Sequence, residues 1–454
     1  MATVIISSHI SDERTAYIEY SARLVPRLMR DMKLYTKVHG KYYDLSGFVH
    51  PGGMQALSLV AGRDATEMFE LHHQFSDRLS VNAILKKYEV REREFISSSD
   101  AYDWAETLNC PFTKELRETA RIILGSDIKA TYNRYYEYTL LFAILLSQWY
   151  CLIKGYWHAV LTFPLALWIF SANVFHDAGH FAISRNFPTI NSLGMNAGFT
   201  LATPYHWYHQ HTLAHHSFPN LPGKDPDLYH IPDNIRLSPD VPVSWPHSIQ
   251  HWSFVFVSTF GLPGYYLCGG ALQCLFGFPY NDIVPLSHTR HMHPYGGPFR
   301  LLCYLIIMHV IPVVAHGITL KSAIFAFVPE FIFMALFTIC SQVNHLTPEC
   351  GLQRSSNFFI HQIITSHNIH PESFLTTLFM GGLNMQIEHH LFPSVNHCHL
   401  HRLVPHVKAL CRKHNVPYPE SNSLWEAIRM HSEHLYNMGS KAYYDKQRKL
   451  KKIE

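Results

Sequence analysis

His176-Asp177-Ala178-Gly179-His180 follows a long apolar run and places two histidines four residues apart. On a helix, this spacing puts both imidazoles on one face, one turn apart, where they can reach the same metal ion. Two more clusters follow, His211-Thr-Leu-Ala-His215-His216 and Gln386-Ile-Glu-His389-His390. His216 lies about a quarter-turn from His215 on a helix and can turn to a second ion. One such cluster is equally typical of a membrane-surface helix, but three clusters beside apolar segments predict a metal centre.

The three clusters supply seven histidines: His176, His180, His211, His215, His216, His389 and His390. One ion rarely uses more than four such ligands, so seven predict two ions. Imidazole suits iron, zinc, copper and nickel alike, and the spacing does not name the metal. The His-Glu-x-x-His motif of zinc proteases does not occur, and Glu388-His389-His390 lacks its spacing, which argues against a zinc hydrolase.

The pattern HxxxH, HxxxHH and QxxHH resembles the histidine boxes of the membrane-bound fatty acyl desaturases. Gln386, where many desaturases have histidine, resembles the front-end branch of this family, whose members carry a fused cytochrome b5 domain. The resemblance implies two non-haem iron ions held by the seven histidines, with Gln386 beside them. It also implies a further ligand at His345, in Gln342-Val-Asn-His345. Gln386 could donate a hydrogen bond to a metal-bound water or oxygen.

Other polar residues near the boxes have secondary roles in this interpretation. Four carboxylates could orient imidazole N–H groups: Asp177, Glu388, Asp225 and Asp227. The last two could instead cap a helix. His206 and His209 are expected at the surface or behind the ligands. Five further histidines are not expected to bind metal: His367, His370, His397, His399 and His401.

The segment from Leu34 predicts a different chemistry. Two short strands are expected around a turn at His39-Gly40, followed by His50-Pro51-Gly52-Gly53, Gly62-Arg-Asp-Ala-Thr66 and His72-His73. The order of these motifs resembles the cytochrome b5 fold. Two imidazoles on opposite faces of a haem leave no open position, so such a centre passes electrons. The resemblance implies haem b between His50 and His73, with His72 as the alternative second ligand.

A haem domain fused to the histidine boxes calls for a redox-active metal, which excludes zinc. Four apolar runs are expected to cross a membrane as two hairpins: Thr139–Ile153, Trp157–Phe175, Leu301–Thr319 and Ala323–Ser341. The run Trp252–Phe278 contains Pro263 and several glycines and is expected to be re-entrant or interfacial. Each hairpin turn carries one lysine and no arginine, which orients the boxes, the haem domain and the C-terminus to the cytosol.

We therefore expect an N-terminal α+β cytochrome b5-like haem domain, then an all-α integral membrane desaturase domain with about four transmembrane helices and a cytosolic cap. The predicted parts are a polar extension (1–30), the haem domain (31–96), a linker with an amphipathic helix (97–137), the desaturase domain (138–420) and a cytosolic tail (421–454). The start of the chain shows no cleavable signal peptide. The C-terminal Lys451-Lys452-Ile453-Glu454 resembles a dilysine retrieval signal of the endoplasmic reticulum.

The resemblance implies an O2-dependent front-end desaturase, which inserts a cis double bond between an existing double bond and the carboxyl end of a long polyunsaturated chain, with a tentative preference for carbon 5. The substrate would be a fatty acyl-CoA or an acyl phospholipid, in contact with membrane lipid. NADH-cytochrome b5 reductase would donate the electrons. A sphingoid long-chain base desaturase and an acyl hydroxylase or epoxygenase are the alternatives. The formal net charge of +3 gives no indication of nucleic-acid binding.

Overall fold

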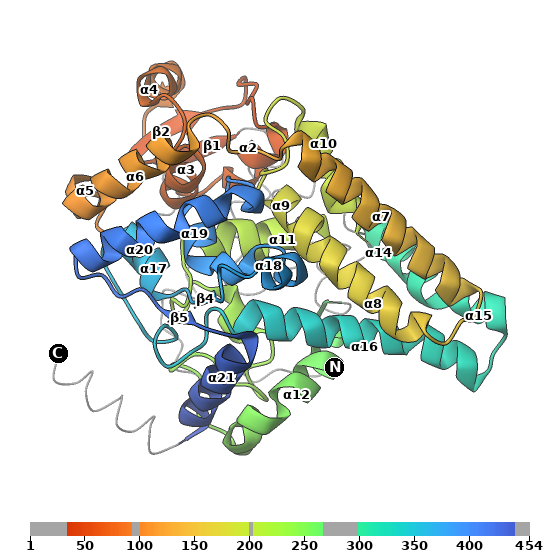
Figure 1. The fold of residues 1–454 in the computed structure, drawn as a ribbon. Coiled ribbons are helices and arrows are strands. Elements are labelled where there is room, and N and C mark those ends of the chain that lie inside the picture. The colour runs from red at the N-terminus through yellow and green to blue at the C-terminus, as the bar shows by residue number, and fades with distance from the viewer. Residues whose placement is uncertain (1–33, 93–99, 199–202, 267–297, 441–454) are drawn as a thin grey trace.

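The computed structural model describes residues 34–92, 100–198, 203–266 and 298–440. A small N-terminal α+β domain sits on one side of a largely helical domain, from which a group of long helices extends (Figure 1). This arrangement confirms the predicted fold class. The predicted N-terminal extension, the dilysine tail and the part of the Trp252–Phe278 run after residue 266 lie outside the described residues.

The N-terminal domain contains an antiparallel sheet of three strands in the order β1 (Tyr35–Val38), β2 (Lys41–Asp44) and β3 (Glu89–Val90). The turn between β1 and β2 falls at His39 and Gly40, both with positive φ, which confirms the predicted strand pair. The helices α2 (Met54–Val60), α3 (Thr66–His72) and α4 (Arg78–Lys86) complete the domain. Its small core contains Val38, Tyr43, Leu45, Leu57 and Ala65.

Two helices lead from this domain to the membrane part. They are α5 (Trp104–Asn109) and α6 (Pro111–Leu124), and the second is amphipathic, as predicted. One face of α6 buries Phe112, Leu116 and Ala120. These side chains join a core shared with the helices of the C-terminal part of the chain, so the linker is packed along its length.

Three helices of the described residues are long and apolar enough to cross a membrane: Tyr132–Ile153 (α7), Ala159–Gly179 and Leu320–Gln342 (α16). The second contains α8 (Ala159–Phe170), the π-helical turn η1 (Ser171–Phe175) and α9 (His176–Gly179). A fourth apolar stretch, Arg300–His316, is shorter than the predicted span Leu301–Thr319. It ends at Gly317, which has a φ of 69° that a side chain would disfavour.

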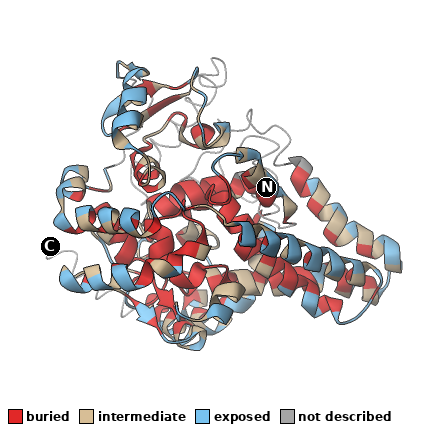
Figure 2. Cartoon of the chain, turned by 45° about the horizontal axis from the view of Figure 1, so that its top comes forward, coloured by how far each residue is buried: buried red, intermediate tan, exposed pale blue. Residues whose placement is uncertain are grey.

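Of the remaining elements, those of the stretch Arg300–His316 lie alongside the long helices (Figure 1). The others form the part of the molecule beside one end of these helices, and most of their residues near the centre are buried (Figure 2). In chain order, the remaining elements are α10 (Pro188–Ala197), α11 (Pro204–Trp207), η2 (Tyr208–His215), η3 (Pro226–Tyr229), η4 (Trp245–Ile249), α12 (Gln250–Gly264), α14 (Pro298–Leu305), η6 (Ile306–Val310), α15 (Ile311–His316), α17 (Phe358–Ile364), β4 (Asn368–Ile369), α18 (Phe374–Met380), η7 (Leu383–Met385), α19 (Gln386–Leu391), η8 (His397–Arg402), α20 (Val404–Lys413), β5 (Glu420–Ser421) and α21 (Leu424–Gly439). The short strands β4 and β5 pair in parallel and tie the C-terminal part of the chain to the segment before the third histidine box.

Glu70 on α3 links the N-terminal domain to α6. Its carboxylate accepts hydrogen bonds from His39 at 2.7 Å and Arg117 at 2.8 Å, and it also pairs with Arg78. Burial alone would raise the pKa of Glu70, but the hydrogen bond from His39 and the charges of Arg117 and Arg78 lower it to about 2. The ionised carboxylate is therefore stabilised in the folded state.

We expect Glu70→Gln to lower the free energy of unfolding of the N-terminal domain by on the order of 3 kcal/mol. Because the folded pKa is depressed from 4.5, this contribution is complete above pH 4.5 and is lost as the pH falls towards 2. Denaturant unfolding of the full-length protein, followed at several pH values, measures it. Glu89→Gln is the control, since the Lys41–Glu89 pair is exposed and its loss should change little. Equal effects of the two substitutions would contradict the prediction.

Candidate metal centre

The first histidine box lies at the inner end of a membrane-length helix. The helix passes through the π-helical turn η1 immediately before His176, and His180 follows the end of α9. Both rings face the same neighbours: the His176 and His180 ring centroids are 4.9 Å apart, and each packs against His211 and His389. The spacing of four residues therefore brings these two imidazoles together, as predicted.

The second box departs from this prediction. Tyr208–His215 is a π-helix, in which the N–H of His216 bonds to the carbonyl of His211, five residues earlier. Residues five apart are therefore aligned, and the Nε2 atoms of His211 and His216 are 3.2 Å apart. His215 turns the other way, to the Nε2 of His345 at 3.2 Å. The predicted pair is still present, because the ligand atoms of His211, His215 and Asp227 lie within 4.8 Å of one another. The π-helix adds His216 as a second close neighbour of His211.

The third box is brought back against η1 by a tight turn. Gly381 and Gly382 before it have positive φ values of 60° and 85°. A Cβ on Gly381 would lie 2.2 Å from the backbone of Ala172 in η1, so this approach requires glycine. The short helix α19 then places both His389 and His390 in the interior, where neither has more than 4% of its surface exposed.

The imidazoles form two groups. In the first, the ligand atoms of His176, His180, His211 and His389 all lie within 4.8 Å of one another, and in the second those of His215, His345 and His390 do so. His216 lies between the groups: its Nε2 is 3.1 Å from that of His389, and its ring stacks on His390 at 4.2 Å. His211, His215 and Asp227 form a further possible set.

The donor set fits metal ions better than it fits protons. Burial and the neighbouring imidazoles hold the pKa values of five rings well below the usual range: His180, His211, His216, His389 and His390. A neutral imidazole nitrogen offers one proton or one lone pair, so His211 and His216, each in contact with two neighbours, cannot satisfy both. Both nitrogens of His180 have no hydrogen-bond partner among the described residues. Cations at the two group centres would use these lone pairs.

Several groups orient the rings through the nitrogen that faces away from the centre. Asp225 accepts a hydrogen bond from His215 Nδ1 at 3.1 Å. The Thr365 carbonyl accepts one from His345 Nδ1 at 2.9 Å. The Gln362 amide oxygen accepts one from His390 Nδ1 at 2.9 Å. Burial lowers the pKa of His215, but Asp225 and Asp227 raise it to about 9. The predicted role of Asp225 thus agrees with the geometry. Gln362 and the Thr365 carbonyl had no sequence signal, since neither belongs to a box.

The other carboxylates differ from the prediction in their partners. Asp177 accepts from His397 Nδ1 at 2.8 Å, and His397 also contacts Arg134, so Asp177 orients a histidine outside the boxes. Glu388 bonds to Asn368 and Tyr418 and to no imidazole, because its side chain leaves α19 on the face away from the rings. Gln386 lies beside the second group, with its amide 2.7 Å from His345 Nε2 and its oxygen accepting from Asn344 at 3.0 Å.

The less favoured histidines stay outside both groups. His206 and His209 are buried, with His206 Nδ1 2.9 Å from the Thr203 hydroxyl, so of the two expected positions the one behind the ligands agrees with the structure and the surface does not. None of the five histidines predicted to be uninvolved belongs to a possible metal set among the described residues: His367, His370, His397, His399 and His401.

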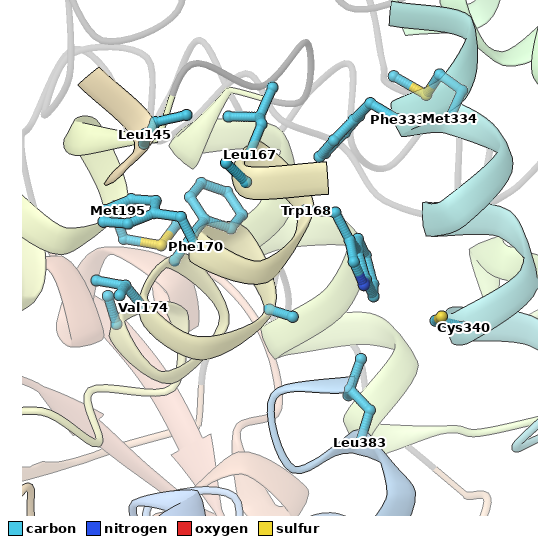
Figure 3. Packing of buried hydrophobic residues seen from close by; sticks show 14 of the residues in the cluster. Leu145, Leu167, Trp168, Phe170, Val174, Met195, Phe333, Met334, Cys340 and Leu383 are labelled. Carbon is cyan, nitrogen blue, oxygen red and sulfur yellow. The ribbon is translucent and has the colours of Figure 1, made fainter. Parts of the chain in front are cut away.

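An apolar pocket reaches the histidines from the membrane helices. Its apolar walls come from Trp168 and Ala172 on one side and Phe333 on the other, and its polar end from His176, His211, His215, His345 and Gln386. Trp168 of α8 and Phe333 of α16 lie 6.4 Å apart by ring centroids, and Figure 3 shows them between the two helices. The pocket can hold an apolar chain with one part next to the metal groups.

In the N-terminal domain, His50 and His73 face one another. Their ring centroids are 5.9 Å apart, which leaves room for an iron between them. The Gly52 N–H donates to His50 Nδ1 at 3.1 Å, and the Ser76 hydroxyl lies 3.3 Å from His73 Nδ1. A neutral His50 that accepts at Nδ1 carries its proton on Nε2, so a metal at Nε2 would move that proton to Nδ1 and break the bond to Gly52. His72 points elsewhere: its Nδ1 bonds to the Met68 carbonyl and its ring packs on Phe181. The geometry therefore favours His73 over His72 as the partner of His50.

Comparison with known proteins agrees with both sites. The model of the fatty acid desaturase family matches residues 152–422, and that of the cytochrome b5-like haem/steroid binding domain matches residues 25–94. The chain is 29% identical to Delta(5) fatty acid desaturase A of Dictyostelium discoideum, over 90% of this chain and 91% of that protein. It is 28% identical to the acyl-lipid (8-3)-desaturase of Mortierella alpina, over 89% of this chain and 94% of that protein. It is likewise 28% identical to Delta(8)-fatty-acid desaturase 2 of Arabidopsis thaliana, over 87% of each chain. The chain therefore belongs to the fatty acid desaturase family, O2-dependent oxidoreductases, as a front-end type with a fused cytochrome b5 domain.

Proposed function

We propose that the protein inserts a cis double bond at carbon 5 of a long polyunsaturated fatty acyl chain, between an existing double bond and the carboxyl end. The observation that carries the proposal is the position of two groups of buried imidazoles at the polar end of an apolar pocket. Two relatives whose names specify Delta(5) and (8-3) desaturation support the position on the chain. The carrier of the acyl chain would be coenzyme A or a phospholipid.

The proposed ligands of one iron ion are His176, His180, His211 and His389, and those of the other are His215, His345 and His390, with His216 between the two. Iron bound there would activate O2, and haem b held by His50 and His73 would supply electrons from NADH-cytochrome b5 reductase. The protein's own contribution is positional. Asp225, Gln362 and the Thr365 carbonyl fix the rings, and the walls near Trp168 and Phe333 hold the chain and exclude water.

We further propose that the protein resides in the membrane of the endoplasmic reticulum, with both centres facing the cytosol. The distribution of charge supports this orientation. Lys154 and Lys321 are the lysines of the two hairpin turns, and no arginine accompanies them there. Because positive residues are enriched on the cytosolic side, the turns are expected on the opposite, lumenal side.

Expression in a host that lacks polyunsaturated lipids, fed a panel of fatty acids, tests the activity directly. We expect products that have lost two hydrogens, with the new double bond at carbon 5 when its position is determined by mass spectrometry. Separate analysis of the acyl-CoA and phospholipid pools identifies the carrier. Products that gain an oxygen atom, or desaturation of fed ceramides alone, would contradict the proposal in favour of a hydroxylase or epoxygenase, or of a sphingoid base desaturase.

Each iron group is expected to be necessary. His180→Ala, His215→Ala and His389→Ala should each lose non-haem iron and at least 10-fold in desaturation, because a lost ligand removes the oxygen-activating centre, while the haem absorption band stays. Metal analysis of the purified proteins should give about two non-haem irons per wild-type chain. His401→Ala, at an exposed histidine, is the matched control and should retain both metals and activity. Stoichiometric zinc in an active wild-type protein would overturn the assignment.

Gln386 tests whether the third box must differ from the general desaturase pattern. Gln386→His puts another nitrogen ligand beside His345, where it would compete for a coordination position, so we expect desaturation to fall at least 10-fold with haem content unchanged. Gln386→Leu removes the amide without adding a ligand and should lose less activity. Wild-type turnover in the histidine variant would show that the glutamine is only structural.

A further inference from the structure

The end of α3 and the residues just after it meet the desaturase domain at two ring contacts, His72 with Phe181 and Phe75 with Phe392, and the first of these directly adjoins a proposed ligand on each side. The imidazole of His72 packs edge-on against the ring of Phe181, with centroids 6.3 Å apart and planes at 72°. His72 is the chain neighbour of His73, and Phe181 is the chain neighbour of His180. The proposed haem ligand His73 is therefore bonded directly to one residue of this contact, and the proposed iron ligand His180 to the other. Only the gap between the two rings is not bridged by covalent bonds.

Phe181 is held in an unusual conformation to make this contact. Its φ is 56°, in the left-handed region that a bulky side chain rarely adopts. The Lys129 ammonium donates to the Phe181 carbonyl at 3.0 Å and to the Ser394 carbonyl at 2.7 Å, and Tyr208 stacks on the Phe181 ring at 5.4 Å. Such strain persists only where the surroundings fix it, and it is concentrated at functional positions. The backbone of Phe181 is thus held by Lys129, and its ring lies between those of His72 and Tyr208.

His72 is also more than a packing residue. Its Nδ1 bonds to the Met68 carbonyl at 3.0 Å, but its Nε2 is inaccessible and has no hydrogen-bond partner among the residues that the structure describes. A buried unpaired nitrogen is costly, and an apolar side chain would avoid that cost.

We propose that the His72–Phe181 contact is the route by which electrons pass from the haem domain to the metal centre within one chain. The inference rests on the proposed haem and iron sites. Each transfer oxidises one ferrous haem to ferric haem and reduces one ferric ion of the centre to ferrous. His72 and Phe181 exchange no atom, proton or net charge, and the electrons come from the reductase that reduces the haem. The two rings shorten the gap that an electron must cross between the domains.

Other contacts also join the two domains, and one of them is a rival route. The Gln74 amide donates to the Leu391 carbonyl at 2.5 Å, and Gln74 and Leu391 are the chain neighbours of His73 and His390. Ser192 donates to Gln55 at 3.0 Å at a separate point. A substitution at Gln74 therefore removes the rival hydrogen bond and leaves the ring contact in place.

Flash photoreduction of the haem in the full-length, iron-loaded and oxygen-free protein tests the route. The decay of the ferrous haem absorbance reports the electron leaving for the non-haem iron. We expect His72→Leu and Phe181→Leu each to slow this decay by about tenfold, equivalent to ~1.4 kcal/mol in activation free energy. His72→Phe keeps a ring against Phe181 and should decay at close to the wild-type rate. Haem content, iron content and the haem midpoint potential should be unchanged in all three variants.

Gln74→Leu is the matched control and should retain the wild-type decay. If it slows the decay as much as His72→Leu does, either the Gln74–Leu391 hydrogen bond carries the electron or domain docking sets the rate, and in both cases the proposed route is wrong. Wild-type decay in both leucine variants at His72 and Phe181 would also overturn it, and equal slowing by His72→Phe would show that an aromatic ring is not what matters. Absence of the haem band or of non-haem iron from the wild-type protein would instead refute the proposed function, so the two failures are distinguishable.

Discussion

The structure depends on holding the buried imidazoles of the three histidine boxes close together, most of them in the neutral form. Burial disfavours the protonated ring, and each neighbouring imidazole adds to that effect. The pKa values of His180, His211, His216, His389 and His390 therefore lie well below the usual range. His215 is the exception, because Asp225 and Asp227 raise its pKa to about 9. Two imidazole nitrogens at 3.1–3.2 Å can share one N–H···N hydrogen bond, but His211 and His216 each have two such neighbours at one nitrogen and cannot pair with both. A bound metal would use the remaining lone pairs, and the surrounding fold holds the rings in place for it.

The fold meets this demand with backbone that departs from the regular α-helix. A π-helical turn precedes His176, another runs through the second box, and a two-glycine turn presses the third box against the first of these turns. Such turns are found mostly at functional sites because they redirect side chains that a regular helix would align. The polar shell behind the rings comes from separate segments of the chain, such as Asp225, Gln362 and the Thr365 carbonyl.

Sequence periodicity predicted the features that regular structure determines. The strand pair around His39-Gly40, three of the membrane-length helices and the pairing of His176 with His180 are consequences of local rules for turns, apolar length and helical spacing. In the two groups made only of histidines, His211 belongs to one group and His215 to the other. This assignment could not be predicted, because nothing in the residues of the second box distinguishes a π-helix from an α-helix. The partners of Asp177 and Glu388 depend on which face of a short helix packs inward. That choice is made by distant segments, such as the one that carries Tyr418, 30 residues beyond Glu388.

The fused haem domain adds a constraint that a separate electron carrier does not have. A covalent link raises the effective concentration of the domain, but it also permits any orientation that the linker can reach. Here the linker helices are packed into the desaturase core, and Glu70, Gln74 and Gln55 anchor the domain at separate points. The segment that carries His73 lies against the desaturase domain through His72 and Gln74. The loop of His50 also approaches that domain, since a Cβ on Gly53 would lie 3.1 Å from the Cβ of Pro188, although Val49 in the same loop is 83% exposed. The docking therefore holds the segments of both proposed haem ligands against the desaturase domain.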